Sequence, residues 1–376
     1  MDSTTLADEL LAEIQGESLQ FLLSSVRDDA VPLGSAGLPA LDARLSAVSP
    51  HGTPLSRGDI LEIQGAAGSG KTHLVYLLLA TCVMPRSYRS LTLPGWDKAA
   101  VVYDTEGTFD MCRFTDILRT RISETLQTFE PNELPGPLEG CVETIAQQCS
   151  AKLFVSRPSS TIQLATSILH LPDLHAEHHD FRHIEVALLV VDSLSSFYWD
   201  DRFTMEQLRG QQSGSRNSLN PLHHVLHALQ HVKKNVNPVM VLTNWGLNPL
   251  HKLSPETKSP FYRQHLHLLP SFNDDYSHST QRGTQLTAVT SSVIPPHNDA
   301  SSSPPHNPVV IDAGSRFPIT HHITLQYLPL DQLTRDALDG RLEEWRCRSH
   351  VHEKSEVLGF VRTFGVAEVG RFSFLL

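Results

Sequence analysis

A glycine-rich stretch at residues 65–72 has the residue types and spacing that point most directly to chemistry. Its sequence, Gly-Ala-Ala-Gly-Ser-Gly-Lys-Thr, matches the phosphate-binding P-loop pattern G-x-x-x-x-G-K-[ST]. Small residues let backbone N–H groups surround phosphate oxygens, and a following helix adds positive potential at its N-terminus. We therefore predict a nucleotide site with ATP as its ligand, formed by Gly65, Ala66, Ala67, Gly68, Ser69, Gly70, Lys71 and Thr72.

Two side chains of this loop have separate expected tasks. Lys71 would contact the β- and γ-phosphates, and the Thr72 hydroxyl would hold Mg²⁺. The flanking residues supply the context that the motif requires, because the apolar run 60–63 suits a buried strand and the run 73–80 suits a helix. The alternative is a loop that keeps this fold without binding a nucleotide.

Further apolar runs along the chain predict the sheet that must position the loop. After residues 60–63, the strand-like runs are 100–103, 152–156, 186–191 and 238–243, and the helical stretches between them include 109–128, 160–171 and 222–235. Near-continuous apolar strands that alternate with helices predict an α/β fold with a mostly parallel sheet covered by helices on both faces. Three late runs, at 319–327, 357–362 and 371–375, predict C-terminal antiparallel strands that extend the same sheet.

Polar side chains follow the predicted strands at the edge where ligands bind in open parallel sheets. Asp192 ends the most apolar run and is the expected Walker B carboxylate, which would reach Mg²⁺ directly or through water. Glu106 ends a neighbouring run and could accept a proton from an attacking water as a catalytic base. The alternatives are a strand-to-loop cap for Asp192 and a solvated loop acid for Glu106.

Composition restricts the class of protein. The 376 residues carry a net charge of −11, whereas a protein that coats DNA without sequence preference is usually basic. The five cysteines are scattered and odd in number, which fits a reducing compartment. No apolar run approaches the ~20 residues of a membrane span, and the polar, acidic N-terminus does not suit a signal peptide. We therefore expect a soluble, intracellular protein.

The same patterns divide the chain into four segments. Residues 1–35 form an expected N-terminal helical segment, 36–246 the ATP-binding core, 247–316 a Ser/Pro/His-rich insertion expected to be disordered, and 317–376 the C-terminal strands that complete the core. A histidine cluster at 175–183 lacks a closed ligand set, so a solvated connection is favoured over a metal site.

Beyond these patterns, the chain resembles the RecA family of recombination ATPases. The segment 104–109, Asp-Thr-Glu-Gly-Thr-Phe, is similar to the segment of eukaryotic strand-exchange recombinases whose glutamate is the catalytic base. The segment 192–202, with Phe-Tyr-Trp shortly after Asp192, resembles more narrowly a recombinase paralogue of the X-ray repair cross-complementing group. The similarity covers residues 36–245 well, the C-terminal strands loosely, and the insertion and extreme N-terminus not at all.

This resemblance implies a RecA-like P-loop ATPase core without the helical N-terminal DNA-binding domain of the full recombinases. It also implies a nuclear subunit of a hetero-oligomeric paralogue complex that assists recombinase filaments in homologous recombination repair of double-strand breaks. Two loops of the family face DNA, and they correspond here to residues 200–220 and 246–316. The expected DNA partner is single-stranded or branched and is contacted through the complex. The first carries Arg202, Arg209 and Arg216, which suit phosphate contacts or an ordinary solvated loop.

One departure from the family lies at the end of the fifth core strand. Full recombinases have Thr-Asn-Gln there, and the glutamine couples the γ-phosphate to the second DNA loop, whereas this chain has Thr243-Asn244-Trp245. An indole can only donate a hydrogen bond, so it cannot form that relay. The resemblance therefore does not extend to ATP-driven switching of the loop, and we expect at most weak, DNA-dependent ATPase activity.

The motifs and the resemblance leave three hypotheses open. The first is an ATP-binding recombinase paralogue that assembles repair complexes, and the second is an interaction scaffold that binds a nucleotide only for its folding. The third is a P-loop kinase or unrelated NTPase, which predicts a lid with clustered arginines that the sequence does not show.

Overall fold

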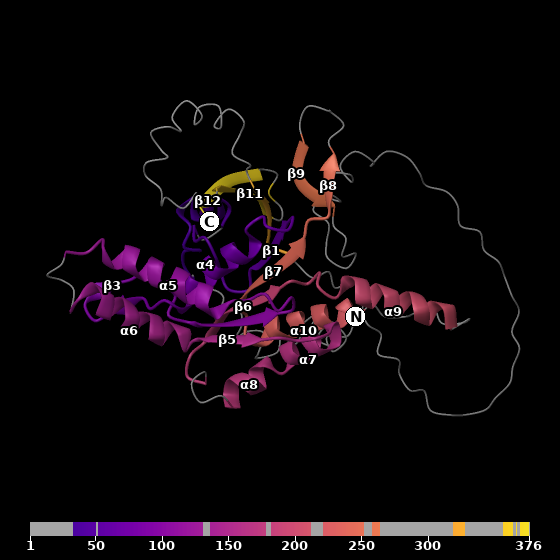
Figure 1. The fold of residues 1–376 in the computed structure, drawn as a ribbon, viewed down its shortest axis with the longest axis horizontal. Helices are drawn as coiled ribbons and strands as arrows, with labels where there is room; N and C mark the ends of the chain where they lie inside the picture. The colour runs from indigo at the N-terminus through magenta and orange to yellow at the C-terminus, as the bar shows by residue number, and fades with distance from the viewer. Residues whose placement is uncertain are drawn as a thin grey trace, which may run out of the picture.

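One mixed sheet forms the centre of the molecule (Figure 1). The computed structural model describes residues 33–49, 52–130, 136–177, 182–211, 221–251, 258–263, 319–327, 356–363, 366 and 369–375. The eight strands follow the order β12-β11-β10-β1-β7-β6-β4-β5. Their bounds are β1 Ile60–Gly65, β4 Ala99–Asp104, β5 Leu153–Ser156, β6 Val186–Asp192, β7 Val239–Trp245, β10 His321–Tyr327, β11 Glu356–Thr363 and β12 Val369–Leu375.

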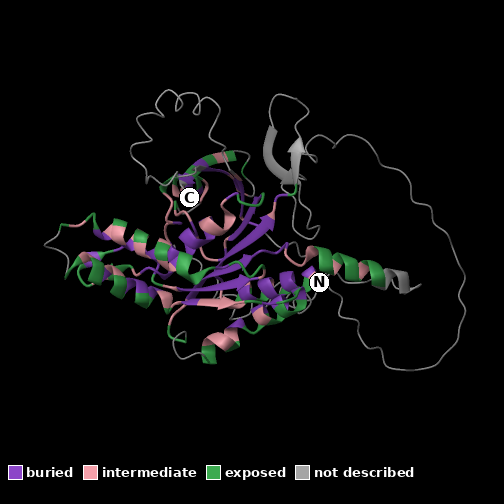
Figure 2. Ribbon diagram, in the orientation of Figure 1, coloured by how far each residue is buried: buried purple, intermediate pink, exposed green. Residues whose placement is uncertain are grey.

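Helices cover both faces of this sheet. Because successive side chains of a strand point to opposite faces, Val102 of β4 packs in one apolar cluster and its neighbours Val101 and Tyr103 in the other. The first cluster includes α3 (Pro39–Val48), α4 (Lys71–Val83), α5 (Met111–Leu126) and α6 (Leu138–Ser150). The second includes α7 (Thr161–Leu169), α8 (Leu171–Glu177) and α10 (Leu222–Asn235). The central strands are consequently buried along their whole length (Figure 2).

Local sequence signals fix where two of the helices begin. The Asp110 side chain accepts hydrogen bonds from the backbone N–H groups of Cys112 and Arg113 at the start of α5. The Ser160 side chain accepts one from the Gln163 N–H at the start of α7. Such N-cap residues satisfy backbone donors that the helix itself leaves unpaired.

The fold class predicted from the sequence is confirmed, because the sheet is mostly parallel, has helices on both faces and ends in antiparallel strands. One detail differs, since β10 is parallel to β1 and only its pairing with β11 is antiparallel. A parallel neighbour requires a crossover of a dozen or more residues, which the long segment between β7 and β10 supplies.

Other elements were not anticipated. A helix, α9 (Tyr198–Gln211), occupies the first half of the segment 200–220 that was expected to be a loop. Two short hairpins were missed, β2 (Ser87–Tyr88) with β3 (Leu91–Thr92) and β8 (Asn248–His251) with β9 (Lys258–Arg263). The second hairpin lies in the insertion 247–316 that was expected to be disordered, and most of that insertion lies outside the described residues, as do residues 1–32. The division into four segments stays a prediction.

Candidate nucleotide-binding site

The P-loop lies between the end of β1 and the start of α4, as the motif predicts. Gly68 and Gly70 have φ values of 74° and 89°, in the left-handed region that favours glycine. A Cβ atom on Gly65 would lie 2.3 Å from Ser69 Oγ and 2.8 Å from the backbone oxygen of Leu325. The loop therefore needs its glycines, while its tip, from Ala66 to Gly68, is exposed to solvent.

Lys71 is folded back over its own loop. Its Nζ donates hydrogen bonds to the backbone oxygens of Gly65, at 3.0 Å, and Ala66, at 2.9 Å. Burial lowers the pKa of Lys71, and the carboxylates of Asp192 and Glu106 oppose that shift. The buried hydroxyl of Ser69 has no hydrogen-bond partner among the described residues. A cation and an unpartnered hydroxyl around an exposed glycine loop fit the phosphates of a nucleotide.

Asp192, at the end of β6, lies beside Thr72, at the start of α4. The Thr72 hydroxyl donates to Asp192 Oδ2 at 3.0 Å, and the Thr243 hydroxyl donates to Asp192 Oδ1. Burial raises the pKa of Asp192, whereas the two hydroxyl donors and Lys71 oppose that rise. A hydroxyl oxygen beside a carboxylate at the end of a P-loop is a donor set that suits Mg²⁺.

Glu106 lies in the loop after β4 and is exposed, although its carboxylate is not free. Its Oε1 accepts a hydrogen bond from Ser193 Oγ at 2.6 Å and a second from Trp245 Nε1 at 2.7 Å. Ser193 directly follows β6, and Trp245 is the last residue of β7. The sheet therefore brings Glu106, Asp192, Lys71 and the P-loop to one edge. The predicted convergence of the strand-end residues is therefore observed.

Two residues that shape the loop carrying Glu106 were missed from the sequence. The buried carboxylate of Asp104 accepts hydrogen bonds from the backbone N–H groups of Thr108 and Phe109, and one from Arg157 Nε at 3.0 Å. This carboxylate thereby fixes the turn around Glu106. The sequence signal was the aspartate two residues before the candidate base, whereas no local pattern indicated Arg157.

Comparison with known proteins shows what the sequence of this chain is similar to. The chain is 34% identical to the DNA repair protein XRCC2 of Mus musculus over 145 residues, which are 39% of this chain and 43% of that protein. It is 23% identical to the DNA repair protein XRCC2 homolog of Arabidopsis thaliana over 217 residues, 52% of this chain and 56% of that protein. This chain is similar to XRCC2.

The similarity to XRCC2 confirms the resemblance to a recombinase paralogue that the motifs predicted. No family model matches the chain. The chain spans about half the length of the curated relatives that it matches. The activity and partners of those relatives are therefore carried to this chain only as proposals.

The three arginines predicted to contact DNA are not brought together by described contacts. Arg202 lies on α9 rather than in a loop, and its guanidinium donates to Glu206 Oε1 at 3.0 Å and lies 5.7 Å from the Trp199 ring centre. An i,i+4 ion pair of this kind adds only slightly to the stability of a helix, which is consistent with a helix where a loop was expected. Arg209 belongs to the same helix, and Arg216 lies outside the described residues.

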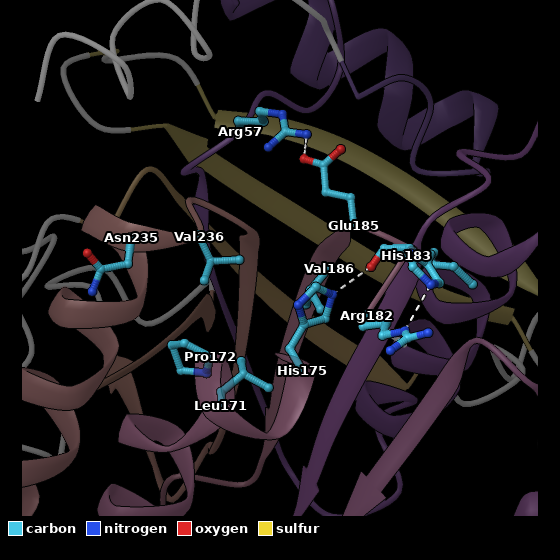
Figure 3. Close-up of a pocket in the computed structure, with 11 residues that line it drawn as sticks. Arg57, Leu171, Pro172, His175, Arg182, His183, Glu185, Val186, Asn235 and Val236 are labelled. Atoms are coloured by element: carbon cyan, nitrogen blue, oxygen red, sulfur yellow. Dashed lines mark hydrogen bonds and ion pairs between the residues drawn. The ribbon is translucent and has the colours of Figure 1, made fainter. Parts of the chain in front are cut away.

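A pocket of about 560 Å³ lies at the opposite edge of the sheet (Figure 3). Its lining comes from residues before β1, β6 and β7, such as Arg57, Glu185 and Val236. Arg57 and Lys98 both pair with Glu185, and His175 contacts the backbone oxygen of Ile184 at 2.7 Å. Ligands of open α/β sheets bind beyond the carboxyl ends of the strands, so this pocket is separate from the P-loop site.

Within the described residues no cluster of potential metal ligands occurs, and no helix is long and apolar enough to cross a membrane.

Asp59, directly before β1, allows us to predict whether the free energy of unfolding rises or falls with pH. Burial raises its pKa to about 6, although the Ser56 N–H donates to its carboxylate at 2.7 Å. The folded chain therefore holds this proton more tightly than the unfolded chain, and the resulting stability is present below pH 4 and lost as the pH rises to 6. We expect the free energy of unfolding of the wild type, relative to Asp59→Asn, to fall by about 1–3 kcal/mol between pH 4 and 6.5.

Urea unfolding at several pH values measures this difference. Burial lowers the pKa of the neighbouring His321 to about 4, which makes stability rise with pH over the same range. That contribution is present in both proteins, so it cancels in the comparison apart from its coupling to Asp59, whose Oδ2 lies 4.0 Å from His321 Nε2. A difference that stays constant from pH 4 to 6.5 would contradict the expectation.

Proposed function

We propose that this chain is an ATP-binding DNA repair protein of homologous recombination, acting as a subunit of a complex of recombinase paralogues. The observation that carries the proposal is the similarity to XRCC2, a DNA repair protein by name. The convergence of the P-loop, Asp192 and Glu106 at one sheet edge supports the ATP-binding part. A nuclear location and contact with DNA through the complex belong to the same proposal.

The chain's own residues would divide the work at this site. The backbone of the P-loop and the Lys71 ammonium would bind the phosphates, and Thr72 with Asp192 would hold Mg²⁺. When bound, MgATP would supply a phosphoanhydride bond that water can cleave. Glu106 would accept a proton from that water. This role requires that one of the two carboxylate oxygens of Glu106 points toward the water.

A second candidate function is a scaffold in which the nucleotide serves only folding. It is favoured by one specific observation, the two hydrogen bonds that already occupy Glu106 Oε1. Such a protein would bind ATP and its partners without appreciable turnover. The two candidates share the site and differ in whether repair requires it.

Affinity purification of the tagged full-length chain from its own cells after DNA damage tests the proposal. We expect mass spectrometry to find another recombinase paralogue at near-stoichiometric amount, since assembly is the proposed task. Purification from undamaged cells, and of an unrelated tagged protein, are the controls. Recovery of the chain alone, or together with metabolic enzymes, would remove the recombination proposal and leave a separate NTPase.

A further inference from the structure

The backbone of Trp245 is fixed beside the first residue of the P-loop. Trp245 is the last residue of β7 and pairs with Gly65, the last residue of β1. The next backbone N–H, that of Gly246, donates to the Gly65 oxygen at 2.8 Å. A movement of Trp245 relative to the P-loop would therefore break the end of the β1–β7 pairing.

A chain of hydrogen bonds between buried side chains holds the backbone of Trp245. Its backbone N–H donates to Ser195 Oγ at 3.0 Å, and that hydroxyl donates to Asn244 Oδ1 at 3.2 Å. Asn244 Nδ2 donates in turn to Glu62 Oε1 at 2.6 Å. Ser195, Asn244 and Glu62 are all buried, so the position of the Trp245 backbone is set by the core of the sheet.

From this fixed position the indole reaches the carboxylate of Glu106, 139 residues away in the sequence. Glu106 Oε1 accepts both the indole N–H, at 2.7 Å, and the hydroxyl of Ser193, at 2.6 Å. A carboxylate oxygen offers about two lone-pair directions, so these donors fill those of Oε1. An indole N–H only donates, and it can hold a carboxylate but never relay a proton from it.

We propose that Trp245 is a positioning residue that, together with Ser193, restrains the Glu106 carboxylate and slows its use as a proton acceptor. The inference rests on the proposed ATP site, and it concerns the rate of hydrolysis rather than the binding of the nucleotide. The full-length chain should bind ATP and hydrolyse it slowly. Removing the indole N–H should leave Oε1 with the Ser193 hydrogen bond alone, so that the carboxylate can turn more readily toward a water molecule.

The variant Trp245→Phe keeps an aromatic ring and removes the hydrogen-bond donor. A fluorescent ATP analogue gives the Kd of each full-length protein, and single-turnover hydrolysis of radiolabelled ATP gives the rate. Because a hydrogen bond to a charged group is typically among the stronger ones, we expect the rate to rise about tenfold while Kd stays within about twofold. The double variant Trp245→Phe/Glu106→Gln should return to the background rate, since the gain acts through Glu106.

The outcomes separate this inference from the proposed function. An unchanged or lower rate for Trp245→Phe, with normal ATP binding, would overturn the restraint and leave the ATP site intact. Absence of ATP binding by the wild type would overturn the ATP site, and with it the catalytic part of the inference. The contact itself has its own readout, because Glu106→Gln should shift the indole N–H resonance of Trp245 in the nucleotide-free chain. An unshifted resonance would show that the indole does not hold Glu106.

Discussion

Replacing Lys71 with alanine is expected to weaken the binding of MgATP by about 100-fold while the chain keeps its fold. The lysine supplies charge-assisted hydrogen bonds, each of which contributes roughly 1.5–3 kcal/mol, and ~1.4 kcal/mol corresponds to a factor of ten. In the structure its ammonium donates to backbone oxygens of the loop itself, those of Gly65 and Ala66, so the core of the sheet does not depend on it. Titration with a fluorescent ATP analogue measures the loss.

The matched control is Lys234→Ala, which removes an exposed lysine at the end of α10, toward the opposite edge of the sheet. This variant should bind MgATP as the wild type does. An equal Kd for Lys71→Ala and the wild type would contradict the assignment of the loop to phosphate binding.

The variant Lys71→Ala also distinguishes the two candidate functions when it replaces the natural protein in cells. If repair fails while the paralogue complex still forms, the chain needs its nucleotide for an ATP-dependent step. If repair and the complex are both normal, the scaffold is favoured. The circular dichroism spectrum of purified Lys71→Ala, compared with that of Lys234→Ala, shows whether both retain their secondary structure.

The sequence predicted the parts of the fold that local patterns encode. The strand β6 and the P-loop were correctly located because a run of apolar residues and a glycine pattern each depend on neighbours in the chain. The meeting of Asp192 with the loop followed from a rule about parallel sheets, since the carboxyl ends of parallel strands share one edge.

Contacts between distant segments could not be predicted in this way. Trp245 was recognised as a departure from the family's glutamine, and its inability to form that glutamine's hydrogen-bond relay was inferred from its chemistry. That its indole would instead bind Glu106 depends on the register of β7 against β1 and on the turn that Asp104 fixes. Likewise, the direction of β10 depends on where a long crossover returns to the sheet, which no local pattern encodes.

A second large effect is expected where β1, β7 and β10 meet beneath the P-loop. Glu62 and His322 are cross-strand neighbours of β1 and β10, and both are buried. His322 Nδ1 lies 3.0 Å from Glu62 Oε2, while Asn244 Nδ2 donates to Glu62 Oε1 at 2.6 Å. Replacing His322 with leucine would leave a buried carboxylate without its imidazole partner, so we expect a loss of about 3–5 kcal/mol in the free energy of unfolding.

The double variant Glu62→Leu/His322→Leu tests whether this cost comes from the stranded carboxylate. It removes both polar groups and replaces them with apolar volume, so it should be less destabilised than His322→Leu alone. Urea unfolding of the wild type, both single variants and the double variant measures these losses in the free energy of unfolding. A loss in the double variant equal to the sum of the two single losses would show that the stranded carboxylate is not the cause. The double variant also removes the acceptor of Asn244, which anchors Trp245 through Ser195. If the core holds the indole on Glu106, the same protein should therefore hydrolyse ATP faster than the wild type, although the buried Asn244 amide that it leaves without an acceptor still costs stability.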